Sequence, residues 1–150
     1  MEHVVLKTEE FEAYGIECKL VGGHMSINGY ARIPEDNPLC RAPRHEIEPL
    51  IRVRGGITYG PDSEGWIGFD TNHAWDVWTQ EEFESFGLHW ATHNQTVFKI
   101  VPEYHDDFVA WTVDRLREET VYLAYQVSIM PLPQCSIWET WSDEPLRSWD

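Results

Sequence analysis

The chain has 150 residues, of which 42% are hydrophobic, and its 26 acidic against 11 basic residues give a formal net charge of -15 at pH 7. A length of this order accommodates one domain with a substantial core. A surface this acidic repels the phosphates of nucleic acids and of an acidic bilayer, so we expect neither a nucleic acid polymer nor a membrane as a partner.

Cysteine usage points to a reducing compartment. Cys18, Cys40 and Cys135 make an odd number and lack the short spacings of a disulfide framework or a zinc knuckle. No stretch approaches the ~18 apolar residues of a membrane span, and the first residues lack the basic-then-apolar order of a signal peptide. We therefore expect a cytoplasmic protein.

The first half of the chain favours strands. Apolar and charged residues alternate over 16–21, as on a half-buried strand. The same even spacing recurs over 25–33, where the pair Asn28-Gly29 indicates a turn or a bulge. A proline-rich loop over 34–49 precedes short strand-like pieces at 51–53, 57–59 and 66–69.

The second half favours helices. Thr79 and Glu82 have the spacing of a capping box, which predicts a short helix near 80–86. A longer helix is predicted over 113–127, with Thr112 as its N-cap. Its apolar stripe recurs every three or four residues, at Val113, Leu116, Thr120, Leu123 and Val127.

Strands early and one long helix late predict an α+β fold, mainly an antiparallel sheet with the C-terminal helix, about 113–127, packed on one face. We expect residues 1–133 to form a single globular domain. Residues 134–150 are expected to form a peripheral acidic tail that is rich in tryptophan.

Basic residues are concentrated between positions 32 and 54. This stretch holds five of the eleven bases and only four acids, whereas the rest of the chain has six bases against 22 acids. Arg52 and Arg54 flank Val53, so on a strand they would share a face. Guanidinium groups bind phosphate or carboxylate through two hydrogen bonds. The alternative is that these arginines only pair with surface carboxylates.

The Gly55-Gly56 pair that follows can adopt positive φ, and successive backbone N–H groups in such turns can cradle an anion. The segment therefore predicts a ligand site in which the arginines hold phosphate and Tyr59 or Trp66 stacks on an aromatic group. The expected ligand-binding residues are Arg52, Arg54, Gly55, Gly56, Thr58, Tyr59, Trp66, Asp70 and His73.

A second motif lies over 68–76, where Asp70, His73 and Asp76 are three residues apart. On a helical turn this spacing brings the side chains to the same face. A histidine with carboxylates can hold a divalent metal or act as an acid–base pair, with His73 and Asp76 as the candidate catalytic residues. The alternative is a structural hydrogen-bonded pair in which Asp70 caps the turn.

These blocks together resemble an uncharacterised family of small bacteriophage and prophage proteins. Its pattern is Gly-Tyr-x-x-x-Pro-x-x-His-Pro, then His-Gly-Gly-Leu-Thr-Tyr, then Gly-Phe-Asp-x-x-His-x-x-Asp, and a helix with Glu and Leu-Ala-x-Gln. The corresponding blocks here are 29–38, 54–59, 68–76 and the helix residues Glu119, Leu123, Ala124 and Gln126.

Two positions depart from this pattern, since Asn37 and Arg54 stand where the family has histidine. Arginine keeps the attraction for anions but removes a group that transfers protons near neutral pH. The resemblance therefore favours binding over catalysis, and the phage distribution implies a role in the encounter between phage and host, in the host cytoplasm.

Three functions follow as hypotheses. The first is an anti-defence protein that binds and sequesters a small anionic, nucleotide-derived immune signal of the host. The second is a metal-dependent hydrolase or phosphodiesterase acting on such a molecule. The third is an inhibitor of a host protein through its acidic and aromatic surface, with Trp75, Trp78 and the tail as anchors. No cofactor is expected beyond a divalent metal, and a homo-oligomer is compatible with each hypothesis.

Overall fold

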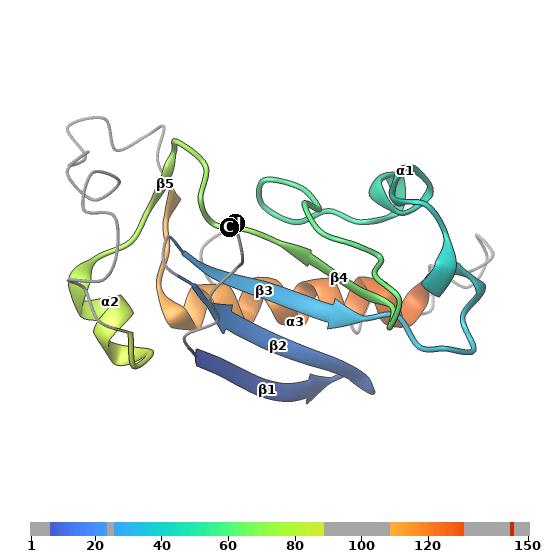
Figure 1. The fold of residues 1–150 in the computed structure, drawn as a ribbon, viewed down its shortest axis with the longest axis horizontal. Coiled ribbons are helices and arrows are strands. Elements are labelled where there is room, and N and C mark those ends of the chain that lie inside the picture. Colours follow the sequence, from blue (N-terminus) through green and yellow to red (C-terminus); the bar gives the residue numbers. More distant parts are fainter. Residues whose placement is uncertain (1–6, 24–25, 89–108, 131–144, 146–150) are drawn as a thin grey trace.

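The computed structural model describes residues 7–23, 26–88, 109–130 and 145. Four strands form an antiparallel sheet in the order β1-β2-β3-β4: β1 (Lys7–Ala13), β2 (Ile16–Gly22), β3 (Ile27–Arg32) and β4 (Trp66–Phe69). The helix α3 (Val113–Ile129) packs across β2 and β3 on one face of this sheet (Figure 1). The predicted α+β class, with its antiparallel sheet and long C-terminal helix, is confirmed.

Smaller elements lie at the two ends of the sheet. Between β3 and β4 come η1 (Pro38–Arg41), α1 (Arg44–Ile47) and η2 (Glu48–Leu50). After β4 come β5 (Asp76–Val77), α2 (Gln80–Ser85) and β6 (Val109–Ala110), and β5 pairs with β6 in parallel. Among the described residues, no helix has the length and apolar character needed to cross a membrane.

Local sequence explains both predicted helices. The hydroxyl of Thr79 accepts the N–H of Glu82 at the start of α2, and the hydroxyl of Thr112 accepts the N–H of Arg115 at the start of α3. The α3 helix extends two residues beyond its predicted end. The predicted tail, residues 134–150, lies outside the described residues apart from Pro145, so the domain boundary stays a prediction.

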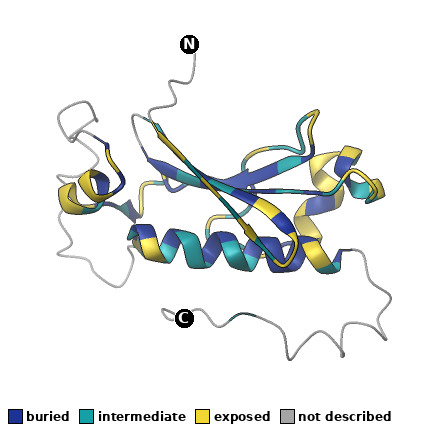
Figure 2. Cartoon of the chain, turned by 90° about the horizontal axis from the view of Figure 1, so that it is seen from below, coloured by how far each residue is buried: buried dark blue, intermediate teal, exposed yellow. Residues whose placement is uncertain are grey.

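The core lies between the sheet and α3 (Figure 2). Alternate residues of β2 and β3 are buried, and they meet the apolar stripe of the helix. The pair Asn28-Gly29, which indicated a turn, lies instead inside the continuous strand β3. A Cβ added to Gly29 would lie 2.2 Å from the hydroxyl oxygen of Thr120, so the glycine allows α3 to approach closely.

Cys18 belongs to this core at 1% exposure, and burial, the largest cause, raises the pKa of its thiol to about 12. The reactive species of a cysteine is the thiolate. We therefore expect Cys18 to stay unmodified by iodoacetamide at pH 8 while the protein is folded, and to react in urea. Mass spectrometry of the peptide that contains Cys18 measures this, and rapid labelling without denaturant would contradict the packing.

Candidate functional site

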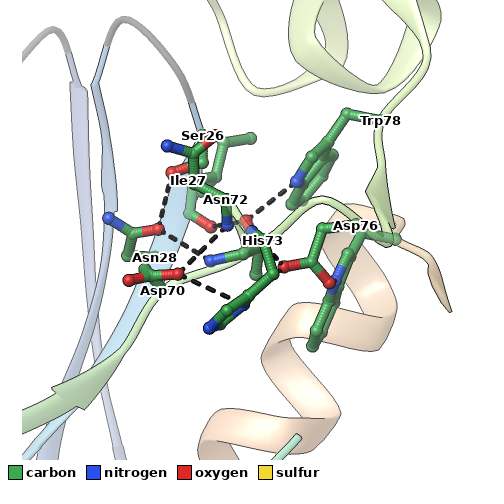
Figure 3. A network of polar contacts seen from close by, with 10 residues as sticks. Ser26, Ile27, Asn28, Asp70, Asn72, His73, Asp76 and Trp78 are labelled. Carbon is green, nitrogen blue, oxygen red and sulfur yellow. Dashed lines mark hydrogen bonds and ion pairs between the residues drawn. The ribbon is translucent and has the colours of Figure 1, made fainter. Parts of the chain in front are cut away.

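Buried polar contacts anchor the turn after β4 to β3 (Figure 3). The hydroxyl of Thr71, a residue 1% exposed, donates to the carbonyl of Ile27 at 2.7 Å and accepts the indole N–H of Trp78 at 2.8 Å. The backbone N–H of Thr71 donates to Oδ1 of Asn28 at 3.2 Å. These bonds fix the start of the segment that carries the predicted catalytic and metal-binding residues.

Asp76 is buried and held by contacts with two residues. It is 3% exposed, its Oδ1 accepts the indole N–H of Trp111 at 2.7 Å, and its Oδ2 accepts the backbone N–H of His73 at 2.8 Å. The same Oδ2 lies 2.9 Å from Nδ1 of the His73 ring. A buried carboxylate held by three donors has a fixed orientation, and it therefore orients the imidazole.

Asp70 approaches the same ring nitrogen, with its Oδ1 3.4 Å from Nδ1 of His73. Because ionised carboxylates only accept hydrogen bonds, Nδ1 carries the hydrogen, and in the neutral ring Nε2 is the acceptor. In Figure 3 the second ring nitrogen points away from both carboxylates. Such an imidazole can transfer a proton or ligate a metal through Nε2.

The three residues predicted as candidate metal ligands lie close together. One potential ligand atom from each of Asp70, His73 and Asp76 lies within 4.8 Å of the other two. Two carboxylates and an imidazole form a donor set suited to a divalent cation. A cation bound at Nδ1 would replace the hydrogen that now lies between His73 and Asp76, so metal and proton compete for this position.

The two predicted halves of the site meet at Gly55. Gly55 and Gly56 both have positive φ, 79° and 78°, as the glycine pair predicts. A Cβ added to Gly55 would lie 2.7 Å from Cε1 of His73, whereas one added to Gly56 would meet nothing within 4 Å. The imidazole therefore lies directly on the backbone of Gly55, and only a residue without a side chain fits beneath it.

The backbone around this turn is already hydrogen-bonded within the chain. The N–H of Arg54 donates to Oε2 of Glu119, at 2.8 Å, and the N–H of Gly56 donates to the carbonyl of Val53, at 2.9 Å. The N–H of Thr58 donates to the carbonyl of Gly68 at 2.9 Å. An external anion does not reach these three groups, so the predicted cradle is in part filled by the protein's own carboxylate.

Neither arginine lies on a strand, and Arg54 belongs to the turn that contains Gly55. The segments 51–53 and 57–59 form no strand, so the predicted strand pieces are wrong, although Tyr59 makes a single bridge to Gly68. The side chain of Arg52 is exposed and that of Arg54 is half-buried. Elsewhere in the basic stretch, Arg32 pairs with Glu17 at 3.0 Å, as the surface-pairing alternative expects.

The predicted stacking residues, Tyr59 and Trp66, are engaged in contacts with residues other than His73. The ammonium group of Lys19 lies 4.2 Å from the centre of the Trp66 ring and covers one of its faces. The hydroxyl of Tyr59 donates to Oδ2 of Asp62 at 2.8 Å, and this bond is the main reason that the pKa of Tyr59 is raised. Tyr59 lines a separate open hollow of about 460 Å³ together with Arg44 and Gly60.

Two tryptophans of the third hypothesis have different environments. Trp75 is 44% exposed, and its ring stacks on His73 with centroids 4.6 Å apart. Trp78 is 2% exposed and stacks on Trp111 and Phe83. Trp78 is therefore a core residue and cannot anchor a partner. Trp75 is the exposed aromatic residue next to the imidazole of His73.

Asn37 lies far from this site. Its Oδ1 accepts the N–H of Leu39, and its Nδ2 donates to the carbonyl of Met130 at 2.8 Å, just past the end of α3. Trp111, which holds Asp76, precedes the other end of this 17-residue helix, about 25 Å away at 1.5 Å per residue. Asn37, where the resembled pattern has histidine, therefore bonds the chain just past the end of α3 and takes no part in the contacts of His73.

Sequence reasoning assigned no role at the site to Trp111, Glu119 or Gln126. Glu119 is fully buried, and Gln126 bonds the backbone of Arg52 twice, accepting its N–H at 2.7 Å and donating to its carbonyl at 2.9 Å. The available signal was a pair of polar residues beside the apolar stripe of a predicted helix. Their partners are more than 60 residues away, which no local pattern reveals.

The contact at Gly55 makes a testable prediction. Alanine at either glycine should lower the free energy of unfolding by about 1 kcal/mol, because both positions have left-handed φ. Only Gly55→Ala also places a methyl group against His73, so only this variant should shift the ring signals of His73 in NMR spectra. Urea titrations and long-range ¹H–¹⁵N spectra measure both effects, and equal spectra for the two variants would refute the contact.

Comparison of the chain with protein-family models, with curated proteins and with solved structures finds no match.

Proposed function

We propose that the protein binds a small anionic, nucleotide-like molecule beside His73 and sequesters it. The observation that carries this proposal is the combination of an oriented imidazole with the exposed ring of Trp75 stacked upon it. An exposed indole face is suited to stacking with a nucleobase, and the exposed guanidinium of Arg52 is suited to a phosphate. Trp75 thus takes the stacking role that was predicted for Tyr59 or Trp66.

The resemblance to phage proteins supports a biological setting for such binding. A phage protein that withdraws a nucleotide-derived signal from solution would silence a host defence that depends on it. This sequestration requires only that the ligand be held, and it requires no turnover. The carboxylates of Asp70 and Asp76 oppose an anion, so the guanidinium groups of Arg52 and Arg54 must supply the attraction.

Calorimetry against a panel of cyclic nucleotides and ADP-ribose derivatives tests the proposal. We expect one member to bind, and we expect Trp75→Ala and Arg52→Ala each to weaken its binding at least tenfold. Tyr14→Ala is the matched control, because Tyr14 is also 44% exposed and packs on Tyr125 in the second half of α3. No binding by any member, or an equal loss in the control, would contradict the proposal.

A metal-dependent hydrolase or phosphodiesterase is the second candidate, favoured by the pairing of Nδ1 of His73 with buried Asp76. Nε2 of His73 would accept a proton from water, or the group Asp70, His73 and Asp76 would hold a divalent cation that polarises the phosphate. Incubation with the bound nucleotide, with Mg²⁺, Zn²⁺ or EDTA, separates the candidates. Mass spectrometry after denaturation recovers intact ligand from a sequestering protein and product from an enzyme.

A further inference from the structure

The helix α3 contacts the segment that carries Arg52, Arg54 and Gly55 through two polar side chains. Glu119 and Gln126 lie seven residues apart, which is close to two turns of an α-helix and places them on the same side of α3. They bond to Arg54 and Arg52 in reverse order, so the segment runs antiparallel to the helix. Together they fix the backbone on both sides of Val53.

The chemistry of the two contacts differs. Gln126 both accepts the N–H and donates to the carbonyl of Arg52, as a neighbouring strand would, and an amide side chain can do both whereas an ionised carboxylate only accepts. Glu119 accepts the N–H of Arg54, for which a carboxylate or an amide oxygen is sufficient. Both side chains are buried, Glu119 at 0% and Gln126 at 8% exposure, so water does not replace a lost bond easily.

This fixed segment leads directly to the site. Gly55 follows Arg54, and the imidazole of His73 packs against its Cα. A Cβ at this position would lie 2.7 Å from Cε1 and 3.2 Å from Nδ1 of the ring. A shift of Arg54 by a fraction of an ångström would therefore move the surface on which the ring rests. Asp76 holds the same ring at Nδ1, so the imidazole has two supports, the backbone of Gly55 and this carboxylate.

We infer that Glu119 and Gln126 are positioning residues, through which α3 sets the geometry of the His73 site without touching a ligand. The ligand-binding part of this inference rests on the proposed function, whereas the positioning part concerns His73 alone. It follows that position 119 tolerates either Glu or Gln, whereas position 126 requires Gln. If burial alone mattered at position 119, Leu would serve there as well as Gln. A difference between these two substitutions therefore reports the hydrogen bond to Arg54.

Long-range ¹H–¹⁵N NMR of the histidine rings at pH 7.5 tests the inference, with the His73 signals assigned from His73→Gln. Glu119→Leu, Gln126→Leu and Gln126→Glu should each shift the ring nitrogens and weaken the preference for hydrogen at Nδ1, whereas Glu119→Gln should keep the wild-type spectrum. Leu123→Ala is the matched control, because it removes buried apolar volume from α3 but no polar contact. Wild-type His73 signals in the three shifted variants, or a shift in Leu123→Ala as large as theirs, would overturn the inference.

Binding supplies a second readout. If a nucleotide of the panel binds the wild-type protein, the three variants that disturb His73 should weaken it about tenfold, and Glu119→Gln should bind normally. If no nucleotide binds the wild-type protein, the proposed function fails while the NMR result still decides the positioning role. Where a leucine variant does not fold, the pair Glu119→Gln and Gln126→Glu gives the same decision, and equal behaviour of these two would overturn the inference.

Discussion

Gly29→Ala is expected to lower the free energy of unfolding by about 3 kcal/mol, the upper part of the range for overpacking a core. The added Cβ would lie 2.2 Å from Oγ1 of Thr120 and 2.8 Å from Cζ of Phe69. Both neighbours are at most 1% exposed, so neither can move away into solvent. Either α3 must move off β3 or the strand must bend, and both changes disturb the layer that supports Gly55.

A double mutant separates this clash from the general cost of changing a glycine. Thr120→Ala removes the closest atom, and by itself it loses a hydrogen bond to the carbonyl of Leu116 and the packing of one buried methyl group. Gly29→Ala combined with Thr120→Ala should therefore be more stable than the sum of the single effects predicts, with the contact to Phe69 still unrelieved. Urea unfolding of all four proteins gives the coupling. Additive effects, or a Gly29→Ala loss below about 0.5 kcal/mol, would show that α3 does not pack as described.

Asp76→Ala is expected to cost about 4 kcal/mol, because it leaves the indole N–H of Trp111 and the backbone N–H of His73 buried without an acceptor. It also removes the group that orients the His73 ring, so ligand binding or catalysis at Nε2 should be lost. Asp76→Asn retains the volume but turns an amide N–H₂ toward donors. We expect it to lose the preference for hydrogen at Nδ1 with a smaller loss of stability.

Trp111→Phe is the matched control for these changes. It removes one donor to Asp76 and leaves both bonds to His73 in place. We expect about 3 kcal/mol of destabilisation, from the acceptor left unpaired and the lost ring volume, together with an unchanged His73 spectrum. Chemical denaturation and the His73 ring signals distinguish the three variants. If Asp76→Ala keeps wild-type stability and wild-type His73 signals, the Asp76–His73 pair does not organise the site.

The position of Asn37 in the structure changes how the sequence is interpreted. In the resemblance to the phage family, Asn37 and Arg54 both stand at positions where the pattern has histidine. Taken together, these two departures favoured binding over catalysis. In the folded protein Asn37 caps the end of α3 remote from Asp76, so only Arg54 bears on the site. The balance between sequestration and hydrolysis therefore depends on His73 and on whether a cation replaces its Nδ1 hydrogen, which metal titration of the purified protein measures.

Sequence by itself determined the features that rest on neighbouring residues. Alternating apolar positions predicted β2, the threonine caps and the apolar stripe predicted α2 and α3, and the glycine pair predicted positive φ at Gly55 and Gly56. Three-residue spacing predicted that Asp70, His73 and Asp76 meet. Each of these patterns repeats over a few residues, and the short-range geometry of the chain is enough to interpret it.

Only the tertiary structure decided what these elements do to one another. It placed Gly29 inside a strand, where the absence of a side chain lets α3 approach the sheet. It also buried Trp78 while leaving Trp75 exposed. It also supplied Glu119 and Gln126 to a segment more than 60 residues away. The physical reason is that buried donors and acceptors must find partners wherever the packed layers bring them, and that choice is made in space, not along the chain.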